Sequence, residues 1–135
     1  MRREEKPLPA SHVKPETVLV VEDMEMVRVL TCHLLEEAGY SALPAASAEE
    51  AVRILEERPG RTRLMLTDAL LPGISGPLLF ENVKKRFPDL RVLFMSGYSL
   101  DDLARDGRAP VGACFIQKPF SAADLAKKVR EALDS

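Results

Sequence analysis

Apolar and polar residues follow one another along this chain in blocks that predict strands and helices in turn. The first block, Thr17–Val21, is a continuous apolar and β-branched run, which is typical of a strand buried on both faces. From Met24 to Ala38 the apolar residues recur at helical spacing, and Gly39 supplies a helix stop. The ordered part of the chain therefore begins with a strand followed by a helix.

The unit of strand, turn and helix recurs four more times. The later strands are predicted at Tyr40–Leu43, Leu64–Asp68, Arg91–Met95 and Ala113–Ile116. Serines precede the later helices; three of them have an acidic residue three positions on, as in a capping box, and the fourth stands before Gly-Pro: Ser47, Ser99, Ser121 and Ser75. This order predicts an α/β fold, a (βα)5 doubly wound parallel sheet with helices on both faces.

Length and composition indicate one globular domain. The chain has 135 residues, of which 46% are hydrophobic and 30% charged, and no apolar run reaches the length that spans a bilayer. Residues 1–16 contain three prolines among charged and small residues, so we expect a flexible leader or linker there and the folded domain at 17–135. Because no apolar segment follows the basic start, it is not a secretory signal, and we expect a cytoplasmic protein.

Charge and cysteine usage argue against several classes of function. The net charge is -2 with both signs spread along the chain, so we expect no binding to nucleic acid or to a membrane by this chain itself. Cys32 and Cys114 lie far apart without a Cys-x-x-Cys pair, which favours buried free thiols over a zinc or redox site. His12 and His33 have no recognisable catalytic partner.

Four of the predicted strands end on polar residues that could act together. Glu22 and Asp23 follow the first strand, Asp68 ends the third, and Ser96 and Lys118 follow the last two. Because the carboxyl ends of parallel strands meet at one edge of a sheet, these side chains are expected to converge. Crowded carboxylates repel unless a cation joins them, and hard oxygen ligands suit Mg²⁺. Asp68 taken alone is equally explained as a turn former.

With these residues in this order, the chain resembles the receiver domain of two-component response regulators. The resemblance covers Thr17 to Leu133 and implies a flavodoxin-like sheet with the strand order 2-1-3-4-5. The segment Met95-Ser96-Gly97-Tyr98 is similar to the corresponding segment of receivers fused to hybrid histidine kinases. A stand-alone receiver is the alternative.

The resemblance implies a phosphorelay function centred on Asp68. This residue would take a phosphoryl group from a phosphohistidine on a histidine kinase or histidine phosphotransfer protein. Glu22, Asp23, Asp68 and the backbone carbonyl of Leu70 would hold Mg²⁺. The domain would then signal to a downstream protein or a tethered domain, and it would be a phosphoacceptor rather than an enzyme.

By the same resemblance, Lys118 and Ser96 would contact the phosphoryl group, and Phe115 would fill the space that Ser96 vacates. We expect this exchange to repack the surface formed by the fourth helix, fifth strand and fifth helix. Leu70 and Tyr98 stand two residues after Asp68 and Ser96, where neither can readily orient an attacking water. A long-lived phosphoryl group is expected.

Two other functions compete with this interpretation. A phosphatase of the haloacid-dehalogenase type also forms an aspartyl phosphate on an α/β sheet, but its second acid belongs at the position that Leu70 occupies. A protein-interaction module that works without phosphorylation is the second alternative. The presence of Asp23, Asp68, Ser96 and Lys118 argues against it.

Overall fold

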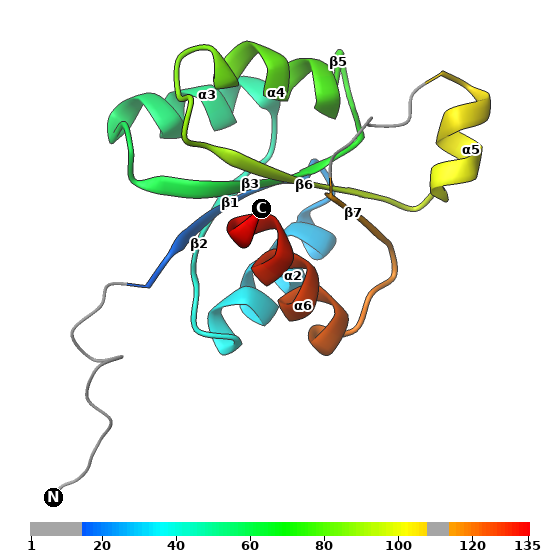
Figure 1. Cartoon of the computed structure of the whole chain (residues 1–135), viewed down its shortest axis with the longest axis horizontal. Helices are drawn as coiled ribbons and strands as arrows, with labels where there is room; N and C mark the ends of the chain where they lie inside the picture. Colours follow the sequence, from blue (N-terminus) through cyan, green and yellow to red (C-terminus); the bar gives the residue numbers. More distant parts are fainter. Residues whose placement is uncertain (1–14, 108–113) are drawn as a thin grey trace, which may run out of the picture.

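A five-stranded parallel sheet forms the middle layer of the protein, which we describe from a computed structural model for residues 15–107 and 114–135 (Figure 1). Its spatial order is β2-β1-β3-β6-β7. In chain order the strands are β1 (Thr17–Val21), β2 (Ser41–Ala45), β3 (Thr62–Asp68), β6 (Arg91–Ser96) and β7 (Cys114–Gln117). Numbered within this sheet alone, they give the flavodoxin-like order 2-1-3-4-5, so the predicted fold is confirmed.

Helices cover both faces of the sheet. α2 (Glu25–Glu37) and α6 (Ala122–Asp134) lie on one face, and α3 (Ala48–Glu57) and α4 (Gly76–Lys84) lie on the other (Figure 1). The short helix α5 (Leu100–Arg105) lies beyond the carboxyl end of β6, at the right of Figure 1. The chain therefore has three layers, as alternating strands and helices predict.

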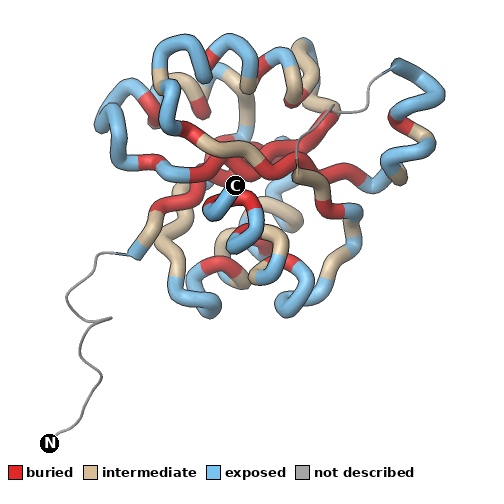
Figure 2. The backbone as a smooth tube through the Cα atoms, viewed as in Figure 1, coloured by how far each residue is buried: buried red, intermediate tan, exposed pale blue. Residues whose placement is uncertain are grey.

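The central strands are buried on both sides, as their uninterrupted apolar runs predict. All five residues of β1 are buried (Figure 2). Alternate residues of β3 face opposite layers. Leu64 and Leu66 pack in the core beneath α2 and α6, whereas Met65 packs in the core beneath α3 and α4. In α6, Leu125, Val129 and Leu133 recur at helical spacing and are buried.

The four helix-starting serines cap their helices as the sequence predicts. The side-chain oxygens of Ser47, Ser75, Ser99 and Ser121 each accept a hydrogen bond from the backbone N–H three residues on, at 3.0–3.2 Å. Only at Ser99 does the acidic partner complete the capping box by accepting from the serine N–H. Glu50 turns instead to the N–H of Ala46, so the box at the start of α3 is modified.

Some local features differ from the sequence prediction. β2 runs through Pro44 rather than ending before it; this strand pairs only with β1, so the missing proline N–H costs it no ladder bond to a second neighbour. Leu70–Leu71 (β4) and Ile74–Ser75 (β5) form an unpredicted two-stranded hairpin around Gly73, whose φ is 83°. Cys32 and Cys114 are half-buried rather than fully buried free thiols. The predicted strand residue Ala113 lies outside the described residues.

The first described residues are attached to the last helix. The backbone carbonyl of Glu16 accepts a hydrogen bond from Ser41 N–H at 2.9 Å, and its carboxylate pairs with Arg130 of α6 at 2.9 Å. Of the expected leader, residues 1–14 lie outside the described part of the chain. Positions 16 and 130 thus meet at the edge of the sheet where β1 begins.

Candidate functional site

Three carboxylates meet at the carboxyl edge of the sheet because β1 and β3 are parallel neighbours. Glu22 and Asp23 follow β1, Asp68 ends β3, and each offers an oxygen within 4.8 Å of the others. Glu22 and Asp68 are buried, whereas Asp23 is exposed. Three hard oxygen donors at this spacing fit a divalent cation such as Mg²⁺, with Asp23 on the side open to solvent.

Lys118 joins two of these carboxylates. Its Nζ lies 2.7 Å from Oε1 of Glu22 and 2.7 Å from Oδ1 of Asp68. The backbone N–H of Lys118 donates to the carbonyl of Ser96 at 2.8 Å, which extends the β6–β7 ladder and sets where the lysine leaves the sheet. The following peptide bond to Pro119 is cis. The structure therefore brings Lys118 to the predicted place.

Burial and neighbouring charge shift the pKa values of the two buried carboxyl groups, Glu22 and Asp68, in opposite directions. Burial first, and then the neighbouring Glu22, raise the pKa of Asp68 to about 7 although Lys118 opposes this change. Burial also acts to raise the pKa of Glu22, but hydrogen bonds from Asp68, Lys118 and the Met24 N–H outweigh it and lower that pKa. Burial alone would lower the pKa of Lys118, yet the two carboxylates raise it. Without a metal, Glu22 carries the charge and Asp68 readily holds a proton.

Ser96 and Phe115 lie on the adjacent strands β6 and β7. Phe115 is opposite Phe94 in the register, so Phe115 and Ser96 point to the same face of the sheet, two positions apart. Ser96 is buried, and its hydroxyl accepts a hydrogen bond from the Tyr98 N–H at 3.0 Å. Among the described residues the hydroxyl makes no bond to Asp68, so Ser96 stands beside the carboxylates without joining them.

Two supporting residues were missed by the sequence analysis. A side chain at Gly76 would collide with the backbone carbonyl oxygen of Asp68, so only glycine lets α4 begin this close to the end of β3. The N–H of Gly76 donates to Ala69 O at 2.8 Å. Arg28 of α2 donates to the carbonyl of Glu22 at 2.8 Å. Ser75-Gly76-Pro77 signalled only a helix start, and nothing local marked Arg28.

One rim of the site is apolar. Met24, Met26 and Leu30 are 60%, 84% and 57% exposed. They begin directly after Asp23 and continue along the outer side of α2. The residues at helical spacing between Met24 and Ala38 include Leu30, Thr31 and Leu35. Thr31 and Leu35 are buried, but Leu30 faces solvent, so the spacing predicts its side wrongly. The site is therefore bordered by an exposed apolar strip, Met24, Met26 and Leu30.

The chain belongs to the response regulator receiver domain family, whose model matches residues 18–130. Receiver domains of this family are the signalling domains of two-component systems, and they act with histidine kinases or phosphotransfer proteins and with downstream effectors. The function predicted from the resemblance, a receiver of a two-component phosphorelay, is confirmed at this level.

Relatives fall among both stand-alone receivers and hybrid kinases. The chain is 39% identical over 118 residues to the sensor kinase CckA of Brucella abortus. The aligned region covers 87% of this chain and 12% of the kinase. It is 31% identical to the receiver protein CpdR of the same organism, with 86% and 95% covered. A crystal structure of the receiver domain of the hybrid histidine kinase CckA superimposes with a TM-score of 0.72 at 35% identity, covering 87% of this chain and 98% of that one.

None of the helices in the described ranges, 15–107 and 114–135, is long and apolar enough to cross a membrane.

Proposed function

We propose that Asp68 is the phosphoacceptor of this receiver. A carboxylate oxygen of Asp68 attacks the phosphorus of a phosphohistidine, the P–N bond breaks, and its electron pair returns to the imidazole nitrogen of the donor. The product is an aspartyl phosphate on Asp68 and a free histidine on the kinase or phosphotransfer protein. The observation that supports this role best is the meeting of Glu22, Asp23 and Lys118 around Asp68.

The carboxylates of Glu22, Asp23 and Asp68 would hold Mg²⁺ together with the backbone carbonyl of Leu70, the first residue of β4. When bound, the ion neutralises negative charge on the phosphoryl oxygens. Lys118 would also neutralise negative charge on the phosphoryl oxygens. Its ion pairs with Glu22 and Asp68 hold the ammonium beside the phosphoacceptor, where that charge develops.

Phosphorylation would switch the surface beyond β6 and β7. The new phosphoryl oxygens draw the hydroxyl of Ser96 away from the Tyr98 N–H, and the half-buried ring of Phe115 turns into the space on the same face of the sheet. The rearranged surface comprises α5, β7 and α6 and would bind a downstream protein or tethered domain. Backbone spectra should change on α5 and β7 when beryllofluoride and Mg²⁺ are added, and unchanged spectra there would contradict the switch.

This role is that of a phosphoacceptor rather than an autonomous enzyme. A haloacid-dehalogenase-like phosphatase needs a second acid two residues after its nucleophile, where this chain has Leu70. A phosphorylation-independent interaction module gives no reason for burying Glu22 and Asp68 around one lysine. We place the receiver at 17–135 after a leader or linker at 1–16, and in the cytoplasm, where ATP supplies phosphohistidine donors.

We further propose that the phosphodonor docks on the apolar strip of Met24, Met26 and Leu30. The donor histidine must come within bonding distance of Asp68, so the donor covers the open side of the site marked by exposed Asp23. The strip continues from that residue without a break. A histidine-bearing helix with an apolar face is the occupant whose chemistry and reach suit both features.

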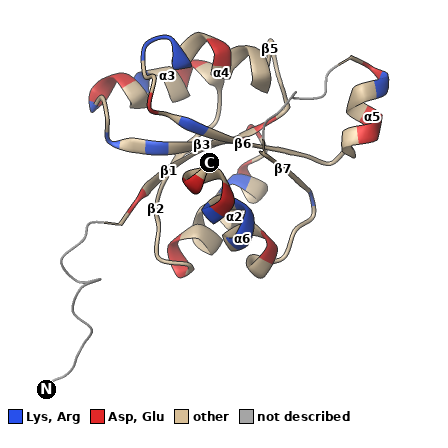
Figure 3. Cartoon of the chain, viewed as in Figure 1, with Lys and Arg blue, Asp and Glu red and all other residues tan. Residues whose placement is uncertain are grey.

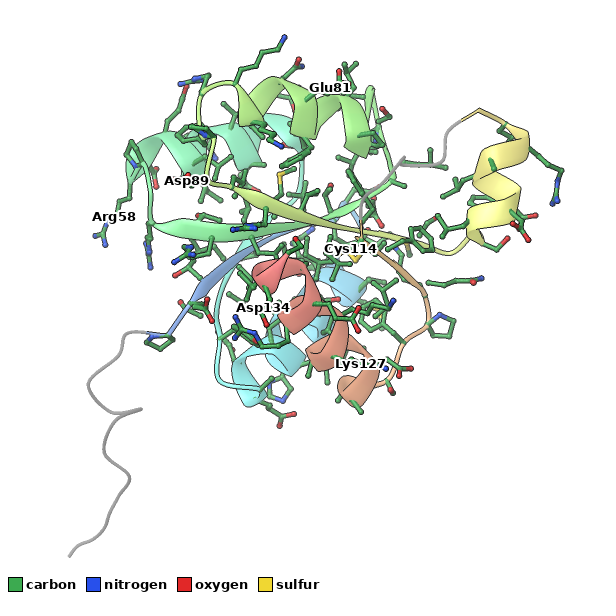
Figure 4. All side chains as sticks on the ribbon, viewed as in Figure 1. Arg58, Glu81, Asp89, Cys114, Lys127 and Asp134 are labelled. Carbon is green, nitrogen blue, oxygen red and sulfur yellow. The ribbon has the colours of Figure 1, made fainter. Side chains whose placement is uncertain are left out.

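Intact mass spectrometry after incubation with acetyl phosphate and Mg²⁺ tests the phosphoacceptor. The wild-type chain should gain one phosphoryl group, and Asp68→Asn should gain none. Asp89→Asn makes the same chemical change at the opposite edge of the sheet and should be labelled like wild type (Figure 4). Absence of label on wild type, or label on Asp68→Asn, would refute the assignment and favour the interaction module.

Single-turnover transfer tests the docking strip. The donor is the autophosphorylated histidine kinase that transfers fastest among a purified panel. Met26→Glu should slow transfer roughly tenfold or more but leave labelling by acetyl phosphate unchanged, because the small donor needs no docking. Leu78→Glu places the same charge on an exposed apolar position of α4 and should transfer normally. Equal rates for both variants would contradict the docking surface.

A further inference from the structure

A second candidate site lies at the edge of the sheet away from Asp68. A pocket of about 540 Å³ is formed by the first residues of β3 and β6 and by the segments that follow α3 and α4. Because β3 runs from Thr62 to Asp68, the pocket and the phosphoacceptor lie at opposite ends of that strand, roughly 20 Å apart at the usual rise per residue. The pocket therefore does not belong to the phosphorylation site.

Arginines are the main charged residues of this pocket. Arg63, Arg86 and Arg91 line it, and Arg58 and Arg61 flank it in the turn that leads into β3. Figure 3 shows basic positions gathered at the starts of β3 and β6, and Figure 4 shows Arg58 and Asp89 at this same end of the molecule. Asp89 is the one carboxylate in the lining. The pocket is thus strongly cationic.

The local charge contrasts with that of the chain as a whole. Segments 56–63 and 84–91 contain seven basic and three acidic residues, whereas the whole chain has 19 basic and 21 acidic residues. The remainder, with twelve basic and eighteen acidic residues, is therefore negative. A cationic end on a protein with a negative balance attracts anions specifically to that end.

Among the three lining arginines, only Arg86 forms an ion pair within the part of the chain that the structure describes. Arg86 pairs with Glu56 at 2.7 Å and lies 5.4 Å from the centre of the Phe87 ring. Within the described residues, Arg63 and Arg91 make no ion pair. Like charges that share one pocket repel each other, and an anion bound between them would relieve that repulsion. Planar guanidinium groups are suited to bidentate contacts with phosphate oxygens.

We propose that this pocket binds a small organic phosphate of nucleotide size. Its volume is typical of small-molecule sites, and Phe87 and Pro59 give it apolar walls beside the arginines. The phosphates would lie between Arg63 and Arg86, and the carboxylate of Asp89 would accept hydrogen bonds from hydroxyl groups of the ligand. An acidic segment of a partner protein is the less suited occupant, because the site is a pocket rather than an extended groove.

Calorimetric titration of the full chain with ATP, pyrophosphate and adenosine, in EDTA to keep Mg²⁺ away from Asp68, tests the proposal. ATP and pyrophosphate should bind and adenosine should not. The double variant Arg63→Gln/Arg86→Gln should weaken ATP binding roughly tenfold or more, since each arginine supplies charge-assisted bonds. The control Arg53→Gln/Arg105→Gln removes two exposed arginines elsewhere and should bind ATP within about twofold of wild type.

Amide chemical shifts locate the ligand without any substitution. Addition of ATP should shift Gly60 and Leu90, which line the pocket, and leave the amide of Asp68 unchanged. No binding of ATP or pyrophosphate at millimolar concentration would overturn the proposal. Shifts confined to the Asp68 end, or binding of a polyglutamate peptide in place of the phosphates, would also overturn it. The double variant should keep the wild-type circular dichroism spectrum, since both arginines are exposed.

Discussion

Replacing Asp68 by asparagine should stabilise the protein when no divalent cation is present. Asp68 is 5% exposed and lies beside the buried carboxylate of Glu22, with one lysine between them. The native fold therefore favours the neutral form of Asp68, and asparagine imitates that form. Lys118 keeps Glu22 as its partner in the variant.

The magnitude follows from the pKa. Folding raises the pKa of Asp68 from 3.8 to about 7, so the folded protein holds a proton that the unfolded chain releases in this range. The stability that depends on this proton is complete below pH 3.8 and is lost as the pH rises through about 7. Three pKa units correspond to about 4 kcal/mol. The attraction to Lys118 is already contained in this shift. Because asparagine reproduces the hydrogen bonds of the neutral acid only in part, we expect a net gain on the order of 2 kcal/mol above neutrality.

Urea unfolding at about pH 8 and about pH 4, in EDTA, measures the effect as a difference in the free energy of unfolding. The gain from Asp68→Asn should appear at the higher pH and nearly vanish at the lower. Glu81→Gln removes an exposed carboxylate from α4 and should change the free energy little at either pH. Added Mg²⁺ should stabilise wild type more than Asp68→Asn. A variant less stable than wild type at the higher pH would refute the reasoning.

Three other substitutions should have separable effects. Lys118→Met leaves Glu22 buried without its cation and should lower the free energy of unfolding by about 3 kcal/mol, measured in urea; unchanged stability would contradict the buried ion pair. Gly76→Ala should cost roughly 2 kcal/mol and slow acetyl phosphate labelling, because the new Cβ pushes on the Asp68 carbonyl; a wild-type labelling rate would show that the close approach is not needed. Leu70→Asn should shorten the lifetime of the aspartyl phosphate several-fold, followed by intact mass, since an amide can orient water; an equal or longer lifetime would count against this role for Leu70.

The sequence predicts the architecture well because each layer leaves a local signal. Uninterrupted apolar runs such as Thr17–Val21 identify strands with helices on both sides, and serines such as Ser99 mark helix starts. Once the strands are parallel, the meeting of Glu22, Asp23 and Asp68 follows from topology.

Other features depend on distances that no local pattern contains. The collision that reserves position 76 for glycine arises between α4 and the end of β3. The basic pocket joins Arg63 and Arg86, which are far apart in sequence and meet where the start of β3 lies beside the segment that follows α4. Leu30 satisfies the helical spacing of the core, yet the structure turns it to solvent. Tertiary packing decides each of these cases.

The contact between Glu16 and Arg130 has a consequence for how the domain can be connected to others. The two residues are 114 positions apart, and their ion pair fixes the entry into β1 beside the end of α6. The start of β1 and the end of α6 therefore both lie at the end of the molecule opposite the carboxylates. Polypeptide joined at either side, or at both, can anchor the domain while Asp23 and the rim above Asp68 stay open to an incoming histidine.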